Sequence, residues 1–183
     1  IEDYCVDSTR VYSTGMSNGG FFTSRLVCEL PDRIAAAVSV AGLTHPESCD
    51  PSRTVPFIAF HGTNDDVVPF SGGESTLAGE GADPAAVDFF DQVMPDEFAE
   101  FAASSQCNPE PVVEVVSDEV TRYDYVECDG GAELAFYEIA DGGHTWPGSP
   151  LGPFLNDTLG YTTDDVNATV DGWAFMQQFS LPS

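Results

Sequence analysis

Residues 11–20 read VYSTGMSNGG and place a β-favouring run directly before a cluster of glycines. The next segment, FFTSRLVCEL at residues 21–30, has the apolar spacing of a helix, and Pro31 ends it. The sequence therefore predicts a short strand, an abrupt turn and a helix in immediate succession. The apolar residues that recur at i+4 along this helix are Phe22, Leu26 and Leu30.

Two continuous apolar runs follow, AAAVSVAG at residues 35–42 and VPFIAFHG at residues 55–62, and each is closed by a glycine. Such runs are typical of strands that are buried on both faces of a parallel sheet. A further strand is expected in AELAFYEIA at residues 132–140, before the loop DGGHTWPG at residues 141–148. The sequence thus predicts an α/β fold with a mostly parallel sheet flanked by helices.

The remaining patterns complete one domain over residues 1–183. Residues 112–128 alternate and turn near Ser117, which predicts a hairpin insertion. Residues 71–81 have the composition of a surface loop, and Pro95 divides the stretch up to Cys107 into two short helices. Residues 164–179 predict a closing amphipathic helix, with an apolar stripe at Val166, Val170, Trp173 and Phe179.

The chain is strongly acidic, with 31 Asp and Glu residues against five basic residues and a formal net charge of −26. Such a surface repels phosphate backbones and anionic lipid, so we expect neither nucleic acid nor a membrane as partner. We interpret the acidity as solvation of the kind that suits a halophilic protein, because salt screens the self-repulsion. Calcium binding at Asp65 and Asp66 or at Asp164 and Asp165 is the alternative.

Five cysteines occur without a CxxC spacing, and the three histidines are too dispersed for a zinc-finger pattern. This number of cysteines in a small domain indicates an oxidising compartment and disulfides. Cys28 and Cys49 flank one predicted strand, and Cys107 and Cys128 flank the predicted hairpin. We therefore expect these two pairs, with Cys5 left over.

Ser17 stands in a G-x-S-x-G pattern, Gly15-Met16-Ser17-Asn18-Gly19, at the predicted strand-to-helix turn. The glycines let the chain turn so abruptly that the serine Oγ stands clear of the sheet. A glycine-rich bend is the other interpretation, but the strand before and the helix after are the context that the motif requires. The helix N-terminus also offers the Asn18 backbone N–H to a developing oxyanion. Ser17 is the candidate nucleophile and Asn18 the candidate oxyanion-hole donor.

A serine hydroxyl becomes nucleophilic when a base, usually a histidine oriented by a carboxylate, accepts its proton. His144 lies in a glycine-rich loop directly after a predicted strand and is the candidate base. His61 at a strand end and His45 in a turn are interpreted as structural. Asp65 and Asp66 both follow a strand by a short loop, and either can be a solvated acid. The chain order Ser, Asp, His of α/β-hydrolases favours Asp65.

Four segments in this order, CVDSTRVYSTGMSNGGFF, RIAAAVSVAG, PFIAFHGTNDDVVPFSGG and GGHTWPG, carry a family resemblance. From about Cys5 to the C-terminus the chain resembles the secreted polyhydroxybutyrate depolymerase and feruloyl esterase group, related to carbohydrate esterase family 1. The resemblance implies an α/β-hydrolase fold, with Ser17 as nucleophile, Asp65 as orienting acid and His144 as base. It also implies that Trp146 lies beside the active-site mouth and stacks on an acyl or sugar group; a packed loop anchor is the alternative.

The chain departs from this group at two places. Where relatives commonly have proline after the motif aspartate, this chain has Asp66. Relatives also carry several strands before the segment that begins here, including a His-Gly turn that supplies a second oxyanion N–H. We therefore expect an N-terminally shortened fold, with an apolar edge exposed at the strand of residues 11–14. A partial chain, a natural minimal hydrolase and a homodimer that covers this edge are three explanations.

The sequence predicts a secreted serine carboxylic ester hydrolase that works through an acyl-enzyme and needs no cofactor or metal. Its expected substrates are small or polymeric esters such as aryl acetates, feruloyl sugars or hydroxyalkanoate polyesters. A non-catalytic truncated hydrolase scaffold is one alternative, motivated by the absent strands. An acidic calcium-dependent binding module is the other, motivated by the acid clusters.

Overall fold

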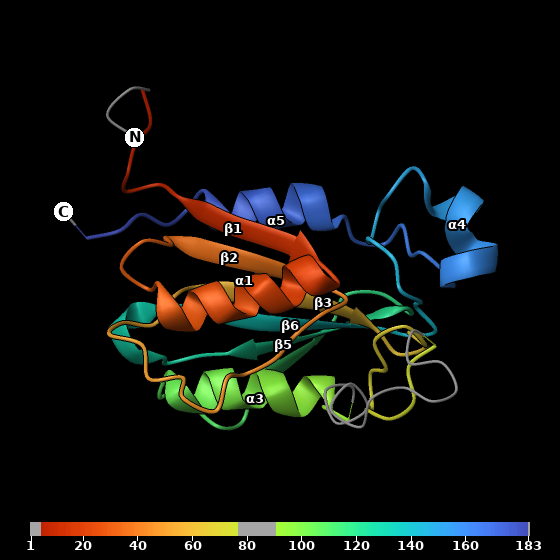
Figure 1. The fold of residues 1–183 in the computed structure, drawn as a ribbon, viewed down its shortest axis with the longest axis horizontal. Helices are drawn as coiled ribbons and strands as arrows, with labels where there is room; N and C mark the ends of the chain where they lie inside the picture. Colours follow the sequence, from red (N-terminus) through yellow and green to blue (C-terminus); the bar gives the residue numbers. More distant parts are fainter. Residues whose placement is uncertain (1–4, 77–90, 183) are drawn as a thin grey trace.

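The computed structural model describes residues 5–76 and 91–182 (Figure 1). Its strands are β1 Tyr12–Met16, β2 Ala36–Val40, β3 Phe57–Gly62, β4 Val112–Val115, β5 Val120–Tyr125 and β6 Leu134–Ile139. Its helices are α1 Asn18–Glu29, α3 Met94–Ser104, the short 3-10 helix Asp129–Gly131, α4 Gly152–Leu159 and α5 Ala168–Met176. The strands form one sheet in the order β1-β2-β3-β6-β5-β4.

The first four strands of this order are parallel, so their carboxyl ends meet at one edge of the sheet. The register pairs Met16 with Val40, Val40 with Phe60, and Gly62 with Ile139. The strands point toward the end of the molecule where α4 lies, away from the two chain termini (Figure 1). The loops that follow β1, β3 and β6 therefore lie at the same edge, which is where open α/β sheets hold their functional groups.

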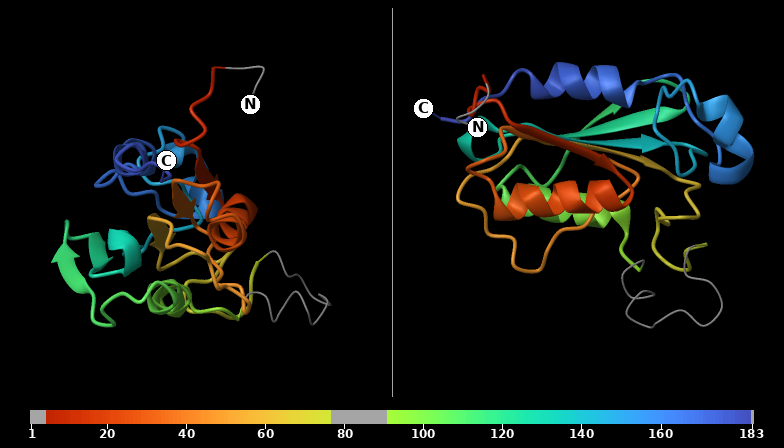
Figure 2. Two further views of the ribbon diagram at one scale, coloured as in Figure 1. Left: turned by 90° about the vertical axis from the view of Figure 1, so that its left-hand side faces the viewer. Right: turned by 45° about the horizontal axis from the view of Figure 1, so that its top comes forward.

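Helices cover both faces of the parallel part of the sheet. Helices α1 and α3 lie on one face and α5 on the other (Figure 2). Every residue of β2 and β3 is buried as a result. The predicted α/β class with a mostly parallel sheet flanked by helices is confirmed, because the two continuous apolar runs are central strands.

Residues 112–128 form a hairpin whose two strands, β4 and β5, are antiparallel. The hairpin extends the sheet, because β5 also pairs antiparallel with β6. Ser117 fixes the turn, since its Oγ accepts hydrogen bonds from the backbone N–H groups of Glu119 and Val120. At the other end of the sheet β1 is the edge strand of the described residues.

The predicted helix is confirmed as α1, but only Leu26 of its i+4 apolar repeat packs against the core. Phe22 is 61% exposed and Leu30 is 45% exposed. The helix instead packs through a stripe of small residues at i+4 spacing, Gly20, Ser24 and Cys28. Small side chains let the helix axis approach β1 and β2 closely, and Phe21 and Val27 are buried beside this stripe, whereas Phe22 and Leu30 face solvent.

In the closing helix, too, the buried face differs from the apolar stripe that the sequence predicted. Helix α5 is shorter than the predicted range of residues 164–179, and Val170 and Trp173 are more than half exposed. Its buried face again has small residues at i+4 spacing, at Ala168 and Gly172. A β-carbon on Gly172 would lie 3.2 Å from Val38 Cγ2 in β2, so only a small residue permits this approach.

Of the two helices predicted before Cys107, one lies within the described residues. Helix α3 is present and begins with Pro95 in its first turn, so this proline starts a helix and does not merely separate two. The other helix falls within residues 77–90, outside the described residues. Helix α4 was not predicted at all. None of the helices in the described part of the chain is long and apolar enough to span a membrane.

Both predicted disulfides are present and the predicted pairing is confirmed. Cys28 is bonded to Cys49, and Cys107 is bonded to Cys128, while Cys5 is an exposed free thiol. Each bond closes a loop of 21 residues. Closing such a loop restricts the unfolded chain, which stabilises the fold by about 3 kcal/mol per disulfide in the chain-entropy description.

Candidate active site

Ser17 occupies a sharp turn between the last residue of β1 and the first residue of α1. Its φ of 56° and ψ of −122° lie in a region that L-residues rarely adopt. The turn is held by hydrogen bonds: the Ser17 N–H donates to Val40 O in β2 (2.9 Å), and Ser17 O accepts from Gly20 N (2.9 Å). This is the strained strand-to-helix geometry that presents a nucleophilic serine in the G-x-S-x-G motif.

The two glycines that follow Ser17 have different environments. A β-carbon on Gly20 would lie 2.5 Å from Gly42 O and 2.7 Å from Ser39 Oγ. A β-carbon on Gly19 would meet no atom within 4 Å. The close packing at the turn therefore depends on Gly20, one residue beyond the motif, and also on Gly15 before Ser17, where a β-carbon would clash with Gly19 O.

Gly20→Ala is accordingly expected to lower the free energy of unfolding by about 2 kcal/mol, because overpacking a closed site costs about 1–3 kcal/mol. Gly19→Ala is the matched control. Its methyl group enters open space in a helix, where alanine is favoured over glycine by about 1 kcal/mol, so we expect equal or higher stability. Urea denaturation of both variants measures the difference. Equal destabilisation of the two variants would show that the space around Gly20 is not limiting.

Asp65 and His144 form a buried pair at the same edge of the sheet. His144 Nδ1 lies 2.8 Å from Asp65 Oδ2. His144 is only 6% exposed and Asp65 only 4% exposed. Asp65 belongs to the loop after β3, and His144 to the loop after β6. Asp66, the other candidate acid, is exposed. The structure thus brings together the histidine and the aspartate that the sequence favoured.

The Asp65 carboxylate is held as an anion by four donors. Oδ1 accepts hydrogen bonds from Val67 N (2.9 Å) and Val68 N (2.8 Å), while Oδ2 faces His144 and also lies 3.4 Å from His61 Nε2. Burial pushes the pKa of Asp65 upward, but the hydrogen bonds from His144 and His61 and the charges of these rings outweigh it and lower the pKa to about 2. Asp65 is therefore ionised at neutral pH.

His61 is a second histidine on the same carboxylate, a role that the sequence did not reveal. The His61 ring is 2% exposed, and its Nε2 lies 2.9 Å from Val68 O. The usable signal was the i+4 spacing of His61 and Asp65 at the end of a buried strand. His45 lies elsewhere, against Phe101, and burial lowers its pKa, partly offset by the charge of Glu100.

The loop of residues 141–148 carries His144 back across the sheet. Gly142 O accepts a hydrogen bond from Asn64 N (2.9 Å), which places the loop over the carboxyl end of β3. Further along, Pro147 O accepts from Ala168 N (3.1 Å) at the start of α5, and α5 packs on β2. The loop therefore runs from β6 over β3 toward β2, the strand to which the Ser17 turn is bonded.

Ser17 lies at this same edge without a direct bond to the histidine. Within residues 5–76 and 91–182, no hydrogen bond joins Ser17 to His144. Catalytic hydrogen bonds are often long in the absence of substrate and tighten when it binds. As the first residue of α1, Asn18 has a backbone N–H without an intrahelical acceptor, as expected of an oxyanion-hole donor. The roles of Ser17, Asp65, His144 and Asn18 in catalysis remain predictions.

Trp146 makes the contacts of a loop anchor. Its indole Nε1 donates to Thr169 Oγ1 in the first turn of α5 (2.9 Å), and its ring packs partly against the core on the α5 face. These contacts explain its place in the GGHTWPG segment. A stacking role of Trp146 toward substrate stays a prediction.

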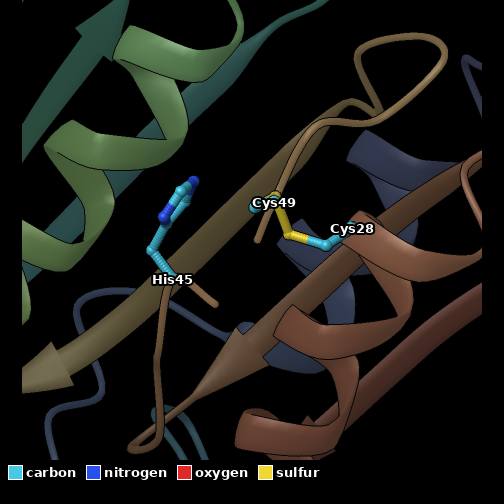
Figure 3. Close-up of side chains that lie close together, drawn as sticks. All are labelled: Cys28, His45 and Cys49. Atoms are coloured by element: carbon cyan, nitrogen blue, oxygen red, sulfur yellow. A yellow bond between two sulfur atoms is a disulfide. The ribbon is translucent and has the colours of Figure 1, made fainter. Parts of the chain in front are cut away.

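One cluster of metal-ligand types occurs in the described residues, at Cys28, His45 and Cys49 (Figure 3). The two sulfur atoms are bonded to each other, so neither can bind a metal as a thiolate while the disulfide is intact. The calcium alternative stays a prediction; at its first acid pair the Asp65 carboxylate already accepts hydrogen bonds from His144 and from two backbone N–H groups.

Comparisons with known proteins relate the chain to esterases. Feruloyl esterase B of Piromyces equi is 29% identical over 183 residues, which cover 97% of this chain and 29% of the esterase. The bifunctional acetylxylan esterase/xylanase XynS20E of Neocallimastix patriciarum is 26% identical over 93% of this chain and 22% of its own length. Feruloyl esterase C of Emericella nidulans is 29% identical over 82% of this chain and 47% of its own length. The chain is similar to esterases.

The resemblance to the feruloyl esterase group is therefore confirmed, although no protein-family model matches the sequence. A solved structure described as a thermostable esterase superposes with a TM-score of 0.50 and 17% identity, covering 98% of this chain and 33% of that one. This likeness bears out the α/β-hydrolase fold. The chain spans less than half the length of the three curated relatives.

Proposed function

We propose that the chain is a serine carboxylic ester hydrolase with Ser17, His144 and Asp65 as its catalytic residues. The observation that carries the proposal is the buried contact between His144 Nδ1 and the ionised Asp65, at the sheet edge where the strained Ser17 turn also lies. The similarity to feruloyl and acetylxylan esterases supports the same chemistry.

The geometry suits acyl transfer in two steps. Asp65 accepts a hydrogen bond from the Nδ1–H of His144 and stays ionised, which leaves Nε2 without a proton and free to take the proton of Ser17 as its Oγ attacks the ester carbonyl. The alkoxide that develops on the carbonyl is stabilised by the Asn18 N–H at the positive end of α1. His144 then returns the proton to the leaving alcohol, and a water repeats the sequence on the acyl-enzyme. No cofactor is required by this mechanism.

For substrates we propose feruloyl esters and acetyl esters of xylan, following the names of the relatives, together with the small aryl esters that the sequence predicts. Hydroxyalkanoate polyesters stay a prediction of the sequence resemblance. Two disulfides suit an oxidising compartment, and we propose an extracellular location. Because β1 is the edge strand of the described sheet, we also keep a homodimer across this edge as a prediction.

Covalent trapping tests the proposal. Incubation with diethyl p-nitrophenyl phosphate is expected to release p-nitrophenolate and to transfer one diethylphosphoryl group to Ser17 Oγ, because the phosphoryl centre resembles the tetrahedral intermediate. Peptide mass spectrometry locates the adduct. The non-catalytic scaffold and the calcium-binding module both predict no adduct. Labelling at another serine, or none at all under conditions in which the protein is folded, would overturn the assignment of Ser17.

A further inference from the structure

Glu119 lies in the turn between β4 and β5, where its carboxylate accepts hydrogen bonds from two side chains of a distant segment. The Tyr161 hydroxyl lies 2.9 Å from each carboxylate oxygen, and Thr163 Oγ1 donates to Oε2 at 2.7 Å. Hydrogen bonds to an ionised acceptor are roughly twice as strong as neutral ones. Glu119 therefore fixes residues 159–163 against the end of the hairpin.

Residues 159–163 in turn support the backbone around His144. The Gly143 N–H donates to Tyr161 O (2.9 Å), and the His144 N–H donates to Leu159 O (2.6 Å). The Thr145 hydroxyl also donates to Tyr161 O, at 3.1 Å. Three consecutive residues centred on the predicted base thus lie against the segment that Glu119 holds.

Glu119 also acts at both ends of the loop of residues 141–148. Just before the loop, the Ala140 N–H donates to the backbone carbonyl of Glu119 (2.8 Å). At the far end, the Gly148 N–H donates to Thr163 O (2.9 Å), and Thr163 is only 1% exposed. One residue of the hairpin turn is therefore connected to the beginning, the middle and the end of the loop that carries His144.

We propose that Glu119 is a positioning residue for His144, acting through Tyr161 and Thr163. The imidazole is hydrogen-bonded to Asp65 through Nδ1. This single hydrogen bond does not by itself fix the orientation of the ring, and therefore does not fix the position of Nε2. The loop backbone must then fix the direction of Nε2 toward Ser17. A displacement of about 1 Å in such an arrangement can cost on the order of 10²-fold in rate. This inference rests on the proposed function, in which His144 is the base.

Tyr161 suits the role of a permanent donor to Glu119. The hydrogen bond to Glu119 raises the pKa of the Tyr161 hydroxyl, as do burial and the nearby charges of Asp165 and Asp164. The hydroxyl therefore keeps its proton through neutral and mildly alkaline pH. Tyr161→Phe removes this proton while keeping the ring, so it isolates the bond to Glu119 from packing.

The kinetic test compares Glu119→Ala with Asp118→Ala, an exposed carboxylate in the same turn. With p-nitrophenyl acetate, Glu119→Ala is expected to lower kcat about 10-fold with little change in KM, and Asp118→Ala to change neither. Glu119→Gln keeps one acceptor oxygen, so it should lie between wild type and Glu119→Ala. Tyr161→Phe should lower kcat, and adding it to Glu119→Ala should lower kcat little further. Equal kcat in the two alanine variants, a change confined to KM, or fully multiplicative effects would each overturn the proposal.

Amide hydrogen exchange gives a readout that does not depend on catalysis. The amides of Gly143 and His144 are expected to exchange faster in Glu119→Ala than in Asp118→Ala, because their acceptors, Tyr161 O and Leu159 O, belong to the segment that Glu119 holds. If the wild-type protein hydrolyses no ester, the proposed function fails, and unequal exchange still supports the anchoring by Glu119. If wild type is active but the exchange rates of the two variants agree, the positioning role fails alone. Should Glu119→Ala not fold, Glu119→Gln and Tyr161→Phe are measured against Asp118→Ala in its place.

Discussion

Ser17→Ala is expected to lower kcat/KM for p-nitrophenyl acetate by about 10⁴-fold or more. Without the hydroxyl no acyl-enzyme forms, and only binding and oxyanion stabilisation remain to assist attack by water. The turn itself should survive, because its hydrogen bonds to Val40 and Gly20 use the backbone of residue 17. Initial rates of p-nitrophenolate release near neutral pH measure the loss.

Ser8→Ala provides the matched control, since Ser8 is an exposed serine well before β1. It should retain the wild-type rate, and all three proteins should unfold at the same urea concentration. Equal rates for wild type and Ser17→Ala would remove the nucleophile from the proposed mechanism. That outcome would leave the non-catalytic scaffold as the better description of a chain with this fold.

The central strands and the Ser17 turn could be predicted from sequence because their determinants are local. A strand buried on both faces is apolar at most positions, and residues 36–40 and 57–62 show this without reference to the rest of the chain, with Ser39 and His61 as the polar exceptions. The turn at Ser17 is predicted by the glycines that lie between a strand-like and a helix-like sequence pattern. In both cases each residue's own chemistry determines the local structure.

The faces of the helices could not be predicted in this way. Hydropathy gives most weight to large apolar side chains, but Phe22 in the repeat that predicted α1 and Trp173 in the stripe that predicted α5 are both more than half exposed. Both helices instead contact the sheet through small residues such as Gly20 and Gly172, because the distance between helix and sheet is set by the partner strand. That distance is a tertiary property, so the pattern of one segment does not contain it.

The contact between Asp65 and His144 could be predicted from the sequence more easily than the segments that hold the His144 loop in place. Chain order selected Asp65 over Asp66, and the structure places the former against His144. Helix α4, which adjoins the His144 loop, was missed although Pro153 in its first turn and Gly160 at its end are the usual signals of a helix. The side-chain hydrogen bonds of Glu119 could not be predicted from the sequence, because their donors lie more than 40 residues away in the chain.

Asp65→Asn is expected to lower kcat by about 10⁴-fold while the fold is kept, because the substitution forces the wrong tautomer on His144. The N–H groups of Val67 and Val68 both donate to Oδ1, and only the oxygen of an asparagine can accept them. The asparagine NH₂ must then face His144 and donate to its Nδ1. The neutral imidazole consequently carries its proton on Nε2, the nitrogen that has to accept the proton of Ser17.

Asp66→Asn, at the exposed neighbouring acid, controls for the loss of one negative charge and should leave kcat unchanged.

The pH dependence of stability and of kcat/KM tests the ionisation of Asp65 separately. Because the pKa of Asp65 is about 2, below that of an unfolded aspartate, its ionisation stabilises the fold above about pH 4 and this contribution is lost as the pH falls toward 2. Any decline of kcat/KM between pH 7 and pH 5 must therefore come from a group other than Asp65. A variant Asp65→Asn that keeps more than about a tenth of the wild-type kcat would contradict the tautomer argument, since Nε2 would then still accept a proton.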